Sequence, residues 1–157
     1  MKSGRVSSRV IVGRLEMADS LLAEIRRLPL ESQAAFLSDR RNIGAAESYL
    51  RRGLEALLDT GRHILAKGFG VAVSEYKEIG PALQRQQVLE RDEAEILRGM
   101  AGYRNRLVHF YYEVTDEELY GICARKLGDI ERIGEAYRRW LKQHPEQWSQ
   151  DADSPVR

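Results

Sequence analysis

Hydrophobic residues recur at alternating intervals of three and four along most of this chain, the spacing of amphipathic helices. The first such stretch runs from about Ser8 to Leu28, where Pro29 stops it. Its apolar positions share one helical face: Ile11, Leu15, Ala18, Leu22 and Ile25. The pattern predicts a helix here, followed by a connector with a short helical turn around Phe36.

A second and longer periodic stretch runs from Asp39 or Arg40 to Lys67. Its apolar stripe keeps the same rhythm: Ile43, Ala46, Leu50, Leu54, Leu57, Gly61 and Leu65. Asp39 is the expected N-cap, since its carboxylate can accept from the first free backbone N–H groups. Gly68 and Gly70 are expected to end the helix, because glycine tolerates the left-handed conformation of a helix stop.

The second half of the chain predicts three further helices. After a loop, a short helix is expected near residues 81–87, and a longer one over about 92–112. A last helix is expected over 115–143, because Thr115 and Glu118 match a capping box in which each satisfies the other's backbone N–H. Its apolar stripe is Leu119, Cys123, Leu127, Ile130, Tyr137 and Leu141.

Four or five amphipathic helices without a strand signal predict an all-α fold, an up-and-down helical bundle. The length of 157 residues suits one domain with a real core. We expect residues 1–143 to form this domain. Residues 144–157 lose the periodicity and are expected to form a flexible C-terminal tail.

Composition and charge exclude several classes of protein. The net charge is +1, so binding of nucleic acid would need a local basic patch. One cysteine, Cys123, excludes an internal disulfide framework and a thiolate cluster for zinc. No apolar run approaches roughly 18 residues, the length of a membrane span. The N-terminal run, residues 10–12, is too short for a signal peptide, so a cytoplasmic protein without a membrane partner is expected.

The segment 103–114, YRNRLVHFYYEV, is more polar than a packing helix requires. Arg104 and His109 lie on different sides of this helix, but the long arginine side chain can reach towards the imidazole. Asn105 lies four residues before His109 and can contact it. The helix therefore carries a guanidinium and an imidazole that can serve one anion. The plainer interpretation is an exposed salt-bridge arginine and a structural histidine.

The spacing of Arg104, His109 and Tyr111 resembles the signature of the HEPN superfamily, specifically the HepT-like toxins of HEPN/MNT toxin–antitoxin systems. The resemblance covers roughly residues 8–140. Three flanking segments are also similar to the family: residues 46–50, 55–64 and 97–102.

This resemblance implies a helical bundle that pairs as a homodimer, in which the Arg–His helices of two subunits form one composite groove. It also implies a metal-independent RNase, an endoribonuclease or RNA-processing enzyme that needs no cofactor and stops cell growth. His109 can then accept or donate a proton, and Arg104 can hold the phosphate of the RNA. Asn105 supports them by orienting His109 or the substrate. Arg106 and Arg98 either add basic character for substrate binding or are solvated surface charges.

Tyr111 has a separate implied role. In HepT-like toxins, the tyrosine two residues after the histidine receives AMP from the partner, a minimal nucleotidyltransferase called the MNT antitoxin. Added AMP places negative charge and bulk beside a site for RNA phosphate, which would silence it. The adjacent Tyr112 is the alternative target.

A second hypothesis belongs to another class: a non-catalytic helical adaptor or substrate-binding subunit for a minimal nucleotidyltransferase. The intact pair Arg104 and His109 favours the enzyme, because an adaptor needs neither. Asp59 and His63, also four residues apart, either form a pair in which Asp59 selects the tautomer of His63 or are plain helix residues.

Overall fold

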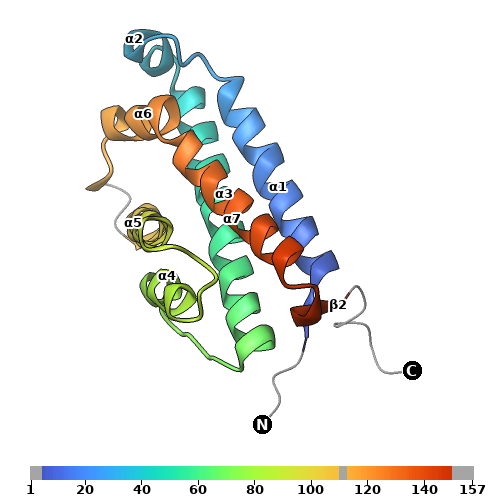
Figure 1. Cartoon of the computed structure of the whole chain (residues 1–157). Helices are drawn as coiled ribbons and strands as arrows, with labels where there is room; N and C mark the ends of the chain where they lie inside the picture. Colours follow the sequence, from blue (N-terminus) through green and yellow to red (C-terminus); the bar gives the residue numbers. More distant parts are fainter. Residues whose placement is uncertain (1–4, 110–112, 150–157) are drawn as a thin grey trace.

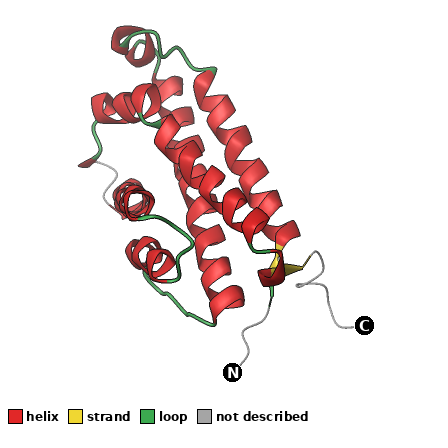
Figure 2. Ribbon diagram, in the orientation of Figure 1, coloured by secondary structure: helices red, strands yellow, loops and turns green. Residues whose placement is uncertain are grey.

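The computed structural model describes residues 5–109 and 113–149. Within these ranges the chain forms seven α-helices, and the predicted all-α bundle is confirmed (Figures 1 and 2). The helices are α1 Ser8–Arg26, α2 Gln33–Leu37, α3 Arg40–His63, α4 Tyr76–Arg85, α5 Arg91–His109, α6 Asp116–Arg125 and α7 Leu127–Gln143. Figure 1 shows α1, α3 and α7 running along one another, with α4 and α5 side by side against them.

The long helix α3 begins and ends as its sequence predicts. Asp39 is the N-cap, and its Oδ1 accepts from the backbone N–H of Arg41 at 2.9 Å. Beyond His63 the helix continues as a short π-helix, Ile64–Gly68. Gly70 then adopts a left-handed conformation with φ of 64°, which ends the helix in the way that glycine favours.

Helix α4 begins at Tyr76, earlier than the expected start at residue 81, so Pro81 lies inside it. The prediction was wrong because a proline disfavours helical backbone in the residue before it, partly through a clash with that residue's Cβ. Here that residue is Gly80, which has no Cβ. Ile79 and Leu83 are buried and supply the face that packs α4 into the core.

The single helix expected over 115–143 is two helices, α6 and α7, which meet at Lys126. Lys126 leaves the helical conformation, with φ of −116° and ψ of 0°. The break lets α6 turn towards α2, where the rings of Phe36 and Tyr120 lie 5.5 Å apart, while α7 follows α1 and α5. Packing on both sides of the break, which sequence periodicity does not report, sets the boundary.

The ends of the described chain meet in a short parallel pairing that has no sequence signal. Val6–Ser7 (β1) pairs with Trp148–Ser149 (β2), which follows a 3₁₀ turn at Pro145–Gln147. Trp148 donates from Nε1 to the carbonyl of Leu141 at 2.6 Å. Residues 145–149 therefore lie against the bundle, and residues 150–157 lie outside the described part.

The structure also bears on the single cysteine and on the predicted lack of a membrane span. Cys123 is buried in α6, and burial raises the pKa of its thiol to about 12, so it packs as an apolar residue. None of the described helices has both the length and the apolar composition needed to cross a membrane.

Close packing of α4 on α5 depends on Gly80. A Cβ at this position would lie 2.6 Å from the backbone carbonyl oxygen of Ala94 in α5. We expect Gly80→Ala to lower the free energy of unfolding by about 1–3 kcal/mol, because backbone must move to admit the methyl group. Urea denaturation of the purified protein measures the change.

The matched control is Gly44→Ala on the exposed face of α3, where nothing lies within 4 Å of an added Cβ. There alanine should raise the free energy of unfolding by about 0.5–1 kcal/mol, since it is the better helix former. Equal stability of Gly80→Ala and the parent would show that α4 and α5 adjust without cost.

Candidate functional site

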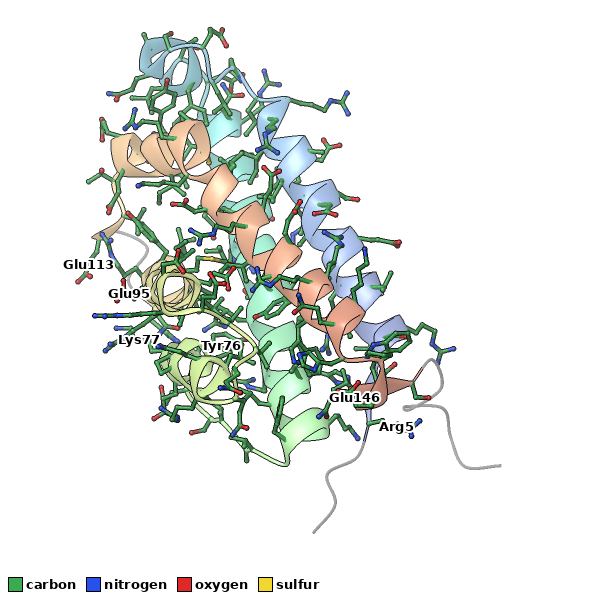
Figure 3. All side chains as sticks on the ribbon, in the orientation of Figure 1. Arg5, Tyr76, Lys77, Glu95, Glu113 and Glu146 are labelled. Carbon is green, nitrogen blue, oxygen red and sulfur yellow. The ribbon has the colours of Figure 1, made fainter. Side chains whose placement is uncertain are left out.

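A cleft of about 630 Å³ opens between the end of α3, the start of α4 and the second half of α5. The cationic side chains of its described lining come from all three helices: Arg62, Lys77, Arg104 and Arg106. His109 also lines it, and Glu75 is the acidic side chain of the described lining. Figure 3 shows Tyr76 and Lys77 on α4, next to α5. The cleft is therefore a local basic site on a chain whose net charge is close to zero.

Arg104 is held on several sides while part of its guanidinium stays available. Its side chain is only 20% exposed, and its Nε lies 3.8 Å from Oε1 of Glu55. Nη1 donates to Oδ1 of Asn105 at 3.4 Å, and Cζ lies 4.7 Å from the ring centroid of Tyr76. Nε is buried without a hydrogen-bond partner among the described residues. Such an arrangement fixes the planar group. The donors left for an anion are those of the Nη atoms, since the buried Nε is closed to the cleft.

Tyr76 connects Arg104 to α3. Its hydroxyl donates to Oδ1 of Asp59 at 2.8 Å, and the Cζ of Arg62 also lies 4.7 Å from its ring centroid. Burial, followed by the hydrogen bond and the negative charge of Asp59, raises the pKa of Tyr76 to about 12. The phenol therefore keeps its proton near neutral pH, and its neutral ring contacts two guanidinium groups.

Arg104 and His109 line the same cleft, although they leave the helix in different directions. His109 is the last residue of α5 and is exposed. Asn105 lines the cleft as well, and its side-chain oxygen accepts from Arg104. The sequence pointed to His109 or the substrate as the partner of Asn105. Its hydrogen bond with Arg104 shows that Asn105 also helps to hold the guanidinium in place.

Arg106 lines the cleft, but its charge is paired. Its Nη1 and Nη2 donate to the two carboxylate oxygens of Glu118, each at 2.9 Å, and Nη2 also donates to the carbonyl of Glu113 at 2.7 Å. The hydrogen bond lowers the pKa of Glu118 and raises that of Arg106. This fork ties α5 to the start of α6, where Thr115 caps the helix by accepting from the N–H of Glu118 at 3.1 Å.

The other residues selected from the sequence lie elsewhere. Arg98 is exposed on α5 and is not part of the described lining of the cleft. Tyr111 and Tyr112, the candidate targets of modification, lie outside the described residues. Among residues 5–109 and 113–149, no group of three or more His, Cys, Asp or Glu side chains could hold a metal ion.

Comparison with known families decides what this bundle is. The model of the family described as "Ribonuclease HepT-like" matches residues 19–137. The chain belongs to the HepT-like ribonuclease family. No curated protein matches it.

Solved structures with the same fold are distant in sequence. A Bacillus subtilis cytosolic protein of unknown function, YutE, has 20% identity and a TM-score of 0.75, with 98% of each chain covered. A tri-AMPylated HEPN toxin of Shewanella oneidensis, in complex with an MNT antitoxin, has 18% identity and a TM-score of 0.75. That match covers 83% of this chain and 97% of the toxin. At these identities the likeness shows that the HepT-like chain shares their fold.

Sequence reasoning missed the basic and aromatic side chains that α3 and α4 bring to the cleft of this HepT-like protein: Arg62, Tyr76 and Lys77. Arg62 stands one turn after Asp59, an ordinary helix spacing, and Tyr76 lies in a stretch that reads as a loop. Two further contacts of the predicted pair Asp59 and His63 could not be read from spacing: Asp59 accepts from Tyr76, and Nε2 of His63 accepts from the backbone N–H of Ser7 at 3.1 Å. Arg62, Tyr76 and Lys77 come together only because α4 packs beside α3 and α5, and no local sequence pattern predicts that packing.

Proposed function

We propose that this HepT-like chain is a ribonuclease toxin that uses Arg104 and His109 to cut RNA without a metal ion. The observation that carries the proposal is that both side chains line one basic cleft. Membership in the HepT-like ribonuclease family supports it, as does the shared fold with a HEPN toxin. A cytoplasmic location remains a prediction of the sequence.

The chemistry follows from the residue types. The 2′-OH of the RNA attacks the adjacent phosphorus, a P–O bond forms, and the bond to the 5′-oxygen of the next nucleotide breaks. His109 accepts the proton of the 2′-OH, or returns one to the leaving oxygen. Arg104 donates two hydrogen bonds to the phosphate oxygens and stabilises the charge that develops on them. Asn105 supports the guanidinium of Arg104.

One histidine per chain does not serve conveniently as base and acid at once, so we propose a homodimer with a composite groove. The position of His109 supports this, because it is exposed at the end of α5. Val108 beside it is a large hydrophobic side chain with 37% of its surface exposed. Burial of such a side chain between two copies would favour pairing.

The proposal is tested by expressing the chain alone and following cell growth, then incubating the purified protein with total RNA in EDTA. Growth arrest and cleavage by the parent but not by His109→Ala support the metal-independent RNase. If the parent neither arrests growth nor cuts RNA, the non-catalytic adaptor becomes the better hypothesis. Co-purification of a nucleotidyltransferase with the chain then tests that alternative.

We also propose that an MNT-type nucleotidyltransferase silences this toxin by transferring AMP to Tyr111, with Tyr112 as the alternative. We expect Tyr111→Phe to remain toxic but to escape inactivation, because it lacks the phenol oxygen that would attack the α-phosphorus of ATP and displace pyrophosphate. Growth in the presence and absence of the partner, with mass spectrometry of the toxin, measures both effects. Tyr112→Phe is the matched control. AMP found only on Tyr112 would move the site by one residue.

A further inference from the structure

Two guanidinium groups from different helices share one aromatic ring in the cleft. Arg62 of α3 and Arg104 of α5 each place Cζ 4.7 Å from the ring centroid of Tyr76. At this distance a cation is attracted by the negative face of an aromatic ring. The ring therefore holds together two positive charges that would otherwise repel, and it fixes the spacing between them.

The charge around Arg62 is only partly compensated. Its Nη1 lies 3.9 Å from Asp59, whose Oδ1 already accepts from Tyr76, and its Nη2 donates to the carbonyl of Ser74 at 3.2 Å. Its Nε is buried without a hydrogen-bond partner in the described part of the chain, as is the Nε of Arg104. Lys77, on the exposed side of α4, adds another positive charge to the same cleft.

A single phosphate does not need all of these groups. Arg104 alone can hold one phosphate with its fork, and the Cζ atoms of Arg62 and Arg104 are separated by no more than twice 4.7 Å. Neighbouring phosphates of one RNA strand can span such a separation. Two phosphates of one strand can therefore occupy the pair, one at each guanidinium.

We propose that Arg62 and Lys77 form a second phosphate subsite, which binds the phosphate next to the one cut at Arg104. Tyr76 is the positioning residue that sets the distance between the two subsites, and Asp59 fixes the phenol. Identification of the anion as RNA rests on the proposed function. The proposal predicts that the enzyme favours substrates with a phosphate beyond the scissile one.

The test compares three short RNAs: a dinucleotide with one phosphate, and the same dinucleotide with an added 5′-phosphate or 3′-phosphate. For the parent, one added phosphate should raise kcat/KM about 10-fold or more, the value of a charged hydrogen bond. In Arg62→Gln this gain should disappear, so that the kcat/KM values of that variant on the three RNAs agree within about twofold.

Controls separate the subsite from general effects. Arg52→Gln removes an exposed arginine of the same helix outside the described lining and should keep the full gain. Tyr76→Leu should lose the gain as Arg62→Gln does, and Tyr76→Phe should retain more of it because the ring remains. Thermal unfolding of each variant establishes that the bundle is intact.

Binding provides a readout that does not depend on cleavage. The affinity of the protein for a fluorescent single-stranded RNA is measured by anisotropy at several salt concentrations. The slope of log K against log salt should fall in magnitude by about 0.7 in Arg62→Gln, since each phosphate contact with a single strand contributes about that much. Arg52→Gln should leave the slope unchanged.

The outcomes distinguish failure of the subsite from failure of the proposed function. If the parent cuts RNA and Arg62→Gln lowers kcat/KM equally on all three substrates, the subsite is refuted and the RNase stands. If the parent cuts nothing, the proposed function fails, and the salt slope decides the subsite alone. An unchanged slope in Arg62→Gln would then overturn it.

Discussion

His109→Ala is expected to slow RNA cleavage by about 10²–10⁴-fold, the usual contribution of a positioned acid or base. Imidazole is the side chain that most often acts as a general acid or base in enzymes, and His109 lines the cleft beside Arg104. Single-turnover cleavage of an RNA in EDTA measures the loss. Thermal unfolding of the variant establishes that the bundle is intact.

A mixing experiment tests the origin of the acid and the base. The parent is combined with an increasing excess of His109→Ala, so that mixed dimers accumulate. If the two histidines of a dimer act as base and acid, a mixed dimer lacks one role, and activity falls well below the share of parent subunits. Activity proportional to the parent subunits would show that each chain works alone. A His109→Ala protein with nearly parental activity would remove the proposed acid–base chemistry altogether.

Arg104→Lys is expected to slow cleavage by about 10²–10³-fold, the cost of removing one donor aimed at developing charge. Lysine keeps the positive charge but loses the planar fork and the contact with the face of Tyr76. The loss should appear mainly in kcat, because the fork is most valuable when charge builds on the phosphate oxygens. Steady-state kinetics on one short RNA separate kcat from KM.

Arg98→Lys is the matched control for this substitution. Arg98 is an exposed arginine of the same helix and does not belong to the described lining of the cleft, so its replacement should leave kcat unchanged. A large effect of Arg98→Lys would restore this residue as a substrate contact, for example through the second copy of a dimer. Parental kcat in Arg104→Lys would show that charge alone, without the fork, suffices.

Much of the fold could be predicted because its long helices are specified locally. Asp39 caps α3 and Thr115 caps α6 through contacts with residues two or three positions away. The start of α4 and the break at Lys126 could not be predicted in this way. The first depends on a glycine that relieves the strain before Pro81, and the second on packing of α6 and α7 against different neighbours.

The residues of the candidate site likewise fall into a group that the sequence could predict and a group that it could not. Arg104, Asn105 and His109 lie within six residues of one helix, so their capacity to serve one anion could be inferred from the sequence, and the groove was implied by the resemblance to the HepT-like family. Arg62 and Tyr76 join them from two other helices. Nothing in their local sequence indicates this, because the contact between Tyr76 and Arg104 forms only when α4 packs on α5.

By itself, then, the sequence determined the helical class, the limits of most long helices and the residue types that can handle a phosphate and a proton. These depend on interactions between residues a few positions apart. Tertiary structure alone decided that Tyr76 contacts two guanidiniums, that Glu118 forms an ion pair with Arg106 and that α4 approaches α5 at Gly80. Such contacts join residues that are distant along the chain, and only the packing of the whole bundle brings them together.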